Sequence, residues 1–179
     1  QAIQACLDHT ADTKTVTMAE VRLNDGQCLH AVNDFFLGIN SHASARYVLE
    51  HSGRIEKHSS CGIIVSTGLG STGWLRSLYA GAIGLVRTMT GSDLPAPDPL
   101  PWDTQSLLYT VREPFPASGN LATLVSGIID EKNPLKVTSI MSENGIIFSD
   151  GIQKDFLQFN AGTVATFRVA DRKGTLVIT

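Results

Sequence analysis

The sequence predicts a mainly β fold with one main helix, an α+β domain of 179 residues. Short segments rich in Val, Ile, Thr and Phe recur along the chain, and Asn-Gly, Asp-Gly and Lys-Gly turns separate them. Only one long stretch, from Ser71 to about Thr88, has its apolar residues at helical spacing. Because no repeat or low-complexity tract divides the chain, we expect residues 1–179 to form a single domain.

The first strands are predicted to form a hairpin. Thr15–Leu23 has the composition of a strand, and Asn24-Asp25-Gly26 is a hairpin turn in which glycine supplies a positive φ. We expect the partner strand at Cys28–Leu37, whereas the residues before Lys14 show little pattern. Two further strands are predicted, at Ala45–Glu50 and Gly62–Thr67.

The predicted helix follows a glycine-rich turn and ends before a proline-rich loop. Ser71 and Thr72 are the candidate N-cap residues, and Gly91 is the candidate stop. Residues 92–103 can be neither helix nor central strand because of their prolines. The remaining strands are predicted at Leu107–Val111, Ala122–Ile129, Lys136–Met141, Gly145–Phe148, Phe156–Phe159, Val164–Val169 and Thr175–Ile178.

Composition and charge limit the classes of partner. Hydrophobic residues make up 42% of the chain and charged residues 17%, as in globular proteins. The net charge of −3 gives no reason to expect nucleic acid or an anionic membrane surface as a partner. No apolar run approaches the roughly 18 residues that span a bilayer, and no signal peptide is visible.

Three single-residue features give further expectations. The cysteines indicate the redox compartment, the histidines indicate whether a metal binds, and the first residue indicates whether the chain is part of a longer protein. Cys6, Cys28 and Cys61 form no close pair, which argues against a disulfide framework or a zinc knuckle and favours a reducing compartment such as the cytoplasm. The five histidines show no metal-binding spacing, so no metal site is predicted. Because the chain starts at Gln1, without a methionine, we expect it to be a piece of a longer protein.

Two charged segments have simple interpretations. The segment from His51 to His58 is interpreted as a solvated hairpin. Arg112 and Glu113 follow a predicted strand and are interpreted as an exposed ion pair, with a place in the lining of the cleft as the alternative.

The glycine-rich turn is the most informative motif. A short apolar strand leads into Gly68-x-Gly70-x-x-Gly73, and the predicted helix follows. This order exposes backbone N–H groups and the positive end of a helix, which suit phosphate or another anion. Four hydroxyl residues in the same turn offer further donors for phosphate or ribose oxygens. These residues are Ser66, Thr67, Ser71 and Thr72.

Two other interpretations of this turn are open. The glycine spacing matches the dinucleotide fingerprint of Rossmann domains, and Asp93 lies about 20 residues beyond it, where that motif places a ribose-binding acid. However, Asp93 lies inside the proline-rich loop, and no alternating βαβα pattern follows, which argues against a Rossmann domain. Alternatively, the glycines only allow a tight connection from strand to helix.

Two segments resemble the NAD kinase family. Residues 62–77 resemble the family's strand, Ser-Thr, glycine-rich turn and Gly-Ser-Thr-Ala-Tyr motif, and residues 31–38 resemble its Ala-Leu-Asn-Glu segment. The residues in these segments are most similar to those of the divergent, mitochondrial-type or sugar kinase-like branch, which makes the mitochondrial matrix an alternative compartment. Further matches are Arg46-Tyr47, Glu56-Lys57, Ser59-Ser60-Cys61-Gly62 and Ser149-Asp150-Gly151.

The resemblance implies a particular half of a two-domain enzyme. Members of the family have an N-terminal α/β domain with a Gly-Gly-Asp-Gly loop and a C-terminal β-sandwich domain that supplies much of the NAD site. This chain matches the second domain and contains no Gly-Gly-Asp-Gly. The full enzyme would use ATP and Mg²⁺ to phosphorylate the adenosine 2′-hydroxyl of NAD, giving NADP. We expect the fragment to bind the dinucleotide, to be inactive alone, and to form a homodimer or homotetramer as its relatives do.

The resemblance also assigns roles to single residues. Asn33 matches the asparagine whose amide contacts the dinucleotide, and Asp34 matches the acid that holds a ribose hydroxyl. Thr72 and Gly73 match positions near the adenine and its ribose, and Gly68 and Gly70 are expected to let the backbone approach the ligand. The other expected binding residues are Ser71, Trp74, which replaces a tyrosine, Ser77 and Asp150.

Departures from the family pattern leave alternatives open. Cys61 stands where Asp is frequent, Leu69 replaces Thr or Ser, and Gly73 replaces Ala, so fewer polar contacts remain. The acceptor could therefore be NADH or another hydroxyl compound, such as a sugar or a lipid. A third hypothesis is a non-catalytic nucleotide-binding module.

Overall fold

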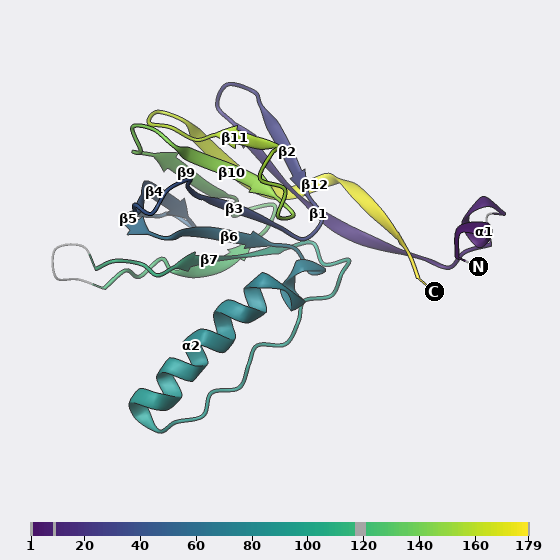
Figure 1. Cartoon of the computed structure of the whole chain (residues 1–179), viewed down its shortest axis with the longest axis horizontal. Helices are drawn as coiled ribbons and strands as arrows, with labels where there is room; N and C mark the ends of the chain where they lie inside the picture. The colour runs from purple at the N-terminus through teal and green to yellow at the C-terminus, as the bar shows by residue number, and fades with distance from the viewer. Residues whose placement is uncertain (1, 9, 117–120, 179) are drawn as a thin grey trace.

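Two antiparallel sheets of six strands each form the body of the protein (Figure 1). The structure is a computed structural model and describes residues 2–8, 10–116 and 121–178. The first sheet has the order β2 (Cys28–Ala31), β1 (Thr13–Leu23), β12 (Val164–Val177), β9 (Leu135–Ser139), β4 (Ala45–His51), β5 (Arg54–Ser60). The second has the order β11 (Phe156–Gln158), β10 (Gly145–Ser149), β3 (Asp34–Ile39), β6 (Gly62–Ser66), β7 (Leu107–Arg112), β8 (Ser126–Ile129). The predicted mainly β fold with one main helix is confirmed.

The second sheet is buried on both faces at its centre. Every residue of β6 and β10 is buried, because alternate side chains point to opposite faces and both faces are covered. Phe35 and Ile63 join the core shared with the first sheet. Phe36 and Ile64 belong to a second cluster on the other face, which Trp74 and Leu78 of helix α2 (Trp74–Thr90) cover. This second cluster fixes the start of α2 against the sheet.

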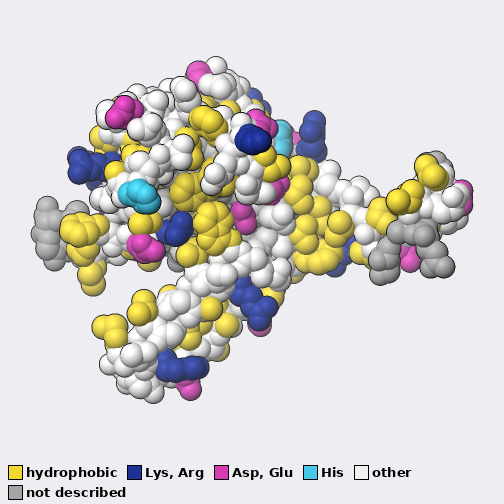
Figure 2. Space-filling view, in the orientation of Figure 1, with side chains coloured by type: hydrophobic (Ala, Val, Ile, Leu, Met, Phe, Trp, Pro, Cys, Tyr) yellow, Lys and Arg dark blue, Asp and Glu magenta, His cyan; other side chains and the backbone are white. Residues whose placement is uncertain are grey.

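Helix α2 projects from the sandwich beyond its first turn. Leu75 is its only buried residue, whereas Leu85 and Met89 are 66% and 83% exposed. Figure 1 shows the helix extending away from the sheets with the proline-rich loop running back beside it, and Figure 2 shows hydrophobic side chains along its surface. The predicted stop is confirmed, since Gly91 ends the helix in the left-handed conformation with φ 70°.

The predicted N-caps of α2 are wrong. Ser71 and Thr72 lie in a 3-10 turn at Gly70–Thr72, and Gly73 occupies the N-cap position without a side-chain bond. The Ser71 hydroxyl donates instead to the Gly68 carbonyl at 2.7 Å, which tightens the turn before the helix begins.

Four strand predictions also need correction. Cys28–Leu37 is not one strand but two, β2 and β3, in different sheets, because the chain crosses between the sheets at Val32 and Asn33. Val164–Val169 and Thr175–Val177 belong instead to one long strand, β12, and Ile178 lies just beyond its end. Strand β12 pairs with β1 across a bulge between Thr17 and Ala19. Only Ser126–Ile129 of the predicted strand 122–129 is extended into a sheet. A short helix, α1 (Ala2–Leu7), was not predicted.

The segment from His51 to His58 is a hairpin, but its histidines are not solvated. His51, the last residue of β4, is 7% exposed, and His58, within β5, is 4% exposed. His58 stacks on Tyr47 with ring centres 5.5 Å apart, and burial lowers the pKa of its imidazole. Side chains alternate between the two faces of each strand, and both histidine rings lie on the inner face. The charged residues between them in the sequence gave no indication of this burial.

Other single-residue predictions can be compared with the described residues. All three cysteines are free. Glu113 accepts a hydrogen bond from Cys61 Sγ at 2.9 Å, and the ion pair predicted between Arg112 and Glu113 is not found in the described part of the chain. Within residues 2–8, 10–116 and 121–178, no helix has the length and apolar character needed to cross a membrane.

Candidate functional site

An open hollow of about 400 Å³ lies where three distant parts of the chain meet. The junction of β2 and β3 contributes Asn33 and Asp34, and the end of β10 contributes Asp150 and Gly151. The turn after β6 and the start of α2 contribute the other lining residues, which are Leu69, Gly70, Thr72, Gly73 and Trp74. Most of the residues expected from the sequence to bind a ligand therefore line one surface.

Asp150 holds the β2–β3 junction in place. Its carboxylate accepts backbone N–H groups from Val32 at 2.9 Å, from Asn33 at 2.7 Å and from Asp34 at 3.2 Å. Its own N–H donates to the Asp34 carbonyl at 2.9 Å. Asp150 adopts φ 52°, a left-handed conformation that Asp tolerates better than most residues, and Gly151 follows with φ 74°. Asp150 thus shapes the hollow through the backbone of its neighbours.

Asp34 is the titratable group of the hollow. Its side chain is nearly buried, at 8% exposure. Burial, together with the nearby charge of Asp150, raises the pKa of the Asp34 carboxyl to about 6. A carboxylate with this environment accepts hydroxyl hydrogen bonds readily, because a donor replaces the solvation that burial removed.

The glycines of the turn are required by the protein's own backbone. A Cβ at Gly70 would overlap the carbonyl oxygen of Asn33, and a Cβ at Gly68 would overlap that of Pro101. Gly70 therefore brings the turn against the β2–β3 junction, and Gly68 brings it against the proline-rich loop. The tight-connection interpretation explains these two glycines without a ligand.

Most hydroxyl groups of the turn are also used internally. Thr67 Oγ1 donates to the Val32 carbonyl at 2.6 Å and accepts the Gly70 N–H at 3.1 Å. Ser66 Oγ donates to the Thr67 carbonyl at 3.1 Å. Thr72 is exposed, and its hydroxyl has only a long contact of 3.4 Å with the Leu69 carbonyl. Of the four hydroxyl residues, Thr72 is the one that lines the hollow.

Trp74 is held at the rim of the hollow by a stack that the sequence did not indicate. Its ring lies 5.7 Å from that of Phe36, with 13° between the planes. The guanidinium carbon of Arg112 lies 5.4 Å from the centre of the same ring. Aromatic pairs and cation–π contacts each contribute about 0.5 to 1.5 kcal/mol. Phe36 on β3 and Arg112 on β7 come from strands of the second sheet that β6 separates, so only the fold shows that both meet Trp74.

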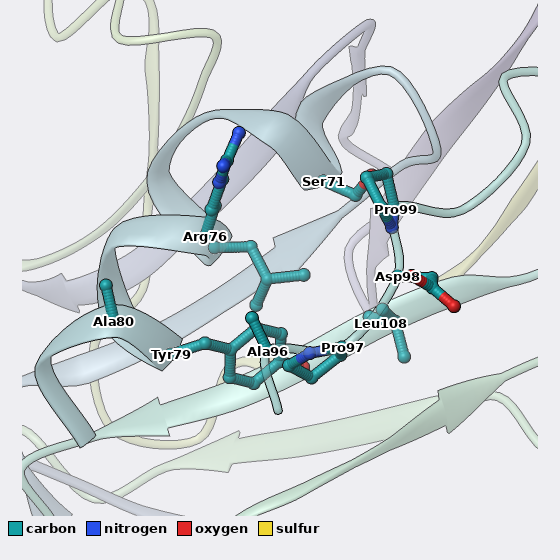
Figure 3. A pocket seen from close by; sticks show the side chains of 10 residues that line it. Ser71, Arg76, Tyr79, Ala80, Ala96, Pro97, Asp98, Pro99 and Leu108 are labelled. Carbon is teal, nitrogen blue, oxygen red and sulfur yellow. The ribbon is translucent and has the colours of Figure 1, made fainter. Parts of the chain in front are cut away.

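Three of the expected binding residues lie outside the hollow. Ser71 lines a separate cavity of about 400 Å³ between α2 and the proline-rich loop, together with Arg76, Tyr79 and Asp98 (Figure 3). Ser77 is exposed on α2 and lines neither space. Gly68 packs against the proline-rich loop. Conversely, Leu69 and Gly151 line the hollow without having been expected there, although each adjoins a predicted residue in the sequence.

The hollow offers a defined set of polar groups. Asp34 supplies a hydrogen-bond acceptor, Thr72 a hydroxyl group and the exposed Asn33 an amide that both donates and accepts. Trp74 supplies an aromatic surface and Gly73 leaves room for close approach. Such a set suits a ligand that carries several hydroxyl groups and a planar ring.

Comparisons with known proteins show the fold. No family model and no curated protein matches the chain. The crystal structure of yeast NADH kinase complexed with NADH has a similar fold, with a TM-score of 0.67 and 16% sequence identity. The match covers 99% of this chain and 47% of the yeast chain, so this chain spans about half the length of its structural neighbour. The chain thus has the fold seen in part of an NADH kinase.

Proposed function

We propose that this chain is the dinucleotide-binding part of an NAD kinase-like phosphotransferase. The full enzyme would transfer a phosphoryl group from ATP, with Mg²⁺, to the adenosine 2′-hydroxyl of NAD or NADH. The observation that carries the proposal is the meeting of Asn33, Asp34, Thr72 and Trp74 in one hollow on this fold. These residues come from segments that resemble the family's binding motifs.

Each residue of the hollow has a task in this proposal. Asp34 accepts hydrogen bonds from ribose hydroxyl groups, and the amide of Asn33 orients the dinucleotide. Thr72 and Gly73 lie against the adenosine, where the small glycine permits close approach. Phosphoryl transfer depends on positioning and on charge stabilisation, so an acceptor held rigidly is half of the requirement. The groups that hold ATP and Mg²⁺ would come from residues outside this chain, because its sequence contains no Gly-Gly-Asp-Gly.

Calorimetric titration of the chain with NAD and with NADH tests the proposal. Asn33→Ala should weaken binding about tenfold, which corresponds to the loss of about 1.4 kcal/mol, roughly one hydrogen bond. Asn40→Ala is the matched control, because Asn40 is also exposed but follows the opposite end of β3. It should change the affinity less than twofold.

The outcomes separate the possible functions. Binding that Asn33→Ala leaves intact, or no binding of either dinucleotide, would refute the proposal. A parent protein that carries Gly-Gly-Asp-Gly should then phosphorylate NAD or NADH, and a panel of sugar and lipid alcohols with ATP would reveal another acceptor. Dinucleotide binding by a parent without kinase activity would identify a non-catalytic module. Self-association into a dimer or tetramer stays a prediction for light scattering to test.

A further inference from the structure

A second cluster of chemically active side chains lies on the outer face of the first sheet. Glu20 on β1 is directly opposite His30 on β2, and Arg22 is directly opposite Cys28. Alternate residues of a strand share a face, so these four side chains project together. Their neighbours in the sequence, such as Ala19, are fully buried and point into the core instead. The cluster shares no residue with the hollow described above.

Glu20 is the centre of this cluster. Its carboxylate is only 5% exposed, and Arg168 on the next strand, β12, binds Oε1 through Nε at 2.9 Å and Nη2 at 2.8 Å. Arg22 binds the same oxygen through Nε at 3.3 Å and Nη2 at 3.2 Å. The other oxygen, Oε2, lies 3.4 Å from His30 Nε2. Both arginines therefore hold one oxygen of Glu20 and leave the second facing His30.

We propose that Glu20, Cys28 and His30 form a zinc-binding site. One atom from each residue is available, and the three atoms lie within 4.8 Å of one another. Zinc prefers this mixture of thiolate, imidazole and carboxylate ligands, with bonds of about 2.0 to 2.3 Å. Tetrahedral bonds of that length place ligand atoms roughly 3.3 to 3.8 Å apart, so a small inward rotation of the side chains completes the site. Water fills the fourth position from the solvent side, where Cys28 and His30 are partly exposed.

The two arginines orient this site and do not exclude the ion. Carboxylates that bind metals are usually fixed by further hydrogen bonds, and Arg22 and Arg168 supply these to Oε1. On binding, Zn²⁺ replaces the proton of the Cys28 thiol, and that proton passes to solvent. The charges of the ion, the Glu20 carboxylate and the Cys28 thiolate then sum to zero. The guanidinium groups therefore face a neutral unit, at partly exposed positions where solvent screens their charge.

The site would fasten the edge of the sheet. Strand β2 has four residues and pairs only with β1 in the first sheet, so few backbone bonds hold it there. A zinc ion with one ligand on β1 and two on β2 links both strands of this hairpin. Ligands that bind only the folded state raise its stability, so zinc should raise the melting temperature of the chain.

Titration with Zn²⁺ and Co²⁺ tests the site in a Cys6→Ser/Cys61→Ser background, which removes the two exposed thiols. We expect one ion per chain, measured by competition with a chromogenic chelator, and a thiolate-to-cobalt charge-transfer band. Cys28→Ser should weaken zinc binding at least tenfold and abolish this band. His30→Gln should weaken binding to a similar extent, and His42→Gln is its matched control on an exposed histidine.

The result does not depend on the dinucleotide. Zinc should raise the melting temperature of the background chain and leave that of the Cys28→Ser chain unchanged, with circular dichroism confirming that both are folded. Should Cys28→Ser fail to fold, His30→Gln carries the same comparison. Zinc affinity that is equal in all variants, or no band with cobalt, would overturn the proposal whether or not NAD binds.

Discussion

Replacing Asp150 with asparagine tests how the hollow is held together. The carboxylate of Asp150 accepts three backbone N–H groups, with Asn33 and Asp34 on Oδ1 and Val32 on Oδ2. Asparagine keeps the shape of the side chain and tolerates the positive φ of 52° at this position. It has only one acceptor oxygen, however, so its amide nitrogen must face one of the donors.

The magnitude follows from these contacts. If the oxygen stays with Asn33 and Asp34, the N–H of Val32 faces a second donor and loses its partner. An N–H group left without an acceptor costs about 1 to 3 kcal/mol, and the two remaining hydrogen bonds weaken because the acceptor is no longer charged. Removing the repulsion between Asp150 and Asp34 offsets part of this loss. We expect a net loss of about 2 kcal/mol, or about 4 to 8 °C in melting temperature for a chain of this size.

The assay needs two readouts. Urea unfolding at pH 7 gives the change in free energy, and the chemical shift of the Asp34 carboxyl carbon against pH gives its pKa. The pKa of Asp34, about 6 in the unaltered protein, should fall in Asp150→Asn because the nearby charge is gone. Asp155→Asn is a control on an exposed aspartate beyond the same strand. Unchanged stability together with an unchanged Asp34 pKa would refute the role given to Asp150.

Two other substitutions probe the same region. Asp34→Asn tests the sign of the pH dependence: a carboxyl whose pKa is raised by folding stabilises the protein fully below pH 3.8, and this contribution is lost as the pH rises to about 6. The free energy of unfolding of the variant minus that of the parent should therefore rise by about 3 kcal/mol across this window. A difference that does not change with pH would contradict the burial argument. Gly70→Ala should destabilise the chain by more than about 3 kcal/mol, because its Cβ would meet the carbonyl oxygen of Asn33. Gly81→Ala is the matched control, since nothing lies within 4 Å, and it should stabilise α2 by about 0.5 to 1 kcal/mol; similar effects of the two changes would count against the close approach.

Local patterns in the sequence were sufficient where the structure depends on local chemistry. The hairpin turn at residues 24–26 and the stop at Gly91 both need a glycine with positive φ, and both are observed. The mainly β fold follows from composition and turns in the same way. The strand predicted at Cys28–Leu37 failed because a change of sheet leaves no local mark: the residues at the crossing are held by Asp150, far away in the sequence.

Contacts between distant strands were hidden for the same reason. The stack of Phe36, Trp74 and Arg112 joins two strands and a helix, and no spacing rule connects them. Glu20 and His30 are ten positions apart, outside any metal-binding spacing, yet strand pairing places them opposite each other. The spacing of the histidines alone could not show this, because the proposed zinc site combines one histidine with two ligands of other types.

The glycine-rich turn shows why structural and functional explanations need not compete. Gly70 is required because the backbone of Asn33 lies against it, and this explanation involves no ligand. The same approach, however, brings Thr72 and Trp74 to the side of Asn33 and Asp34, and so creates the hollow. A side chain at residue 70 would separate the turn from the β2–β3 junction and open the surface between them. Gly70→Ala should therefore weaken dinucleotide binding as well as stability, although residue 70 itself would offer the ligand no polar side-chain group.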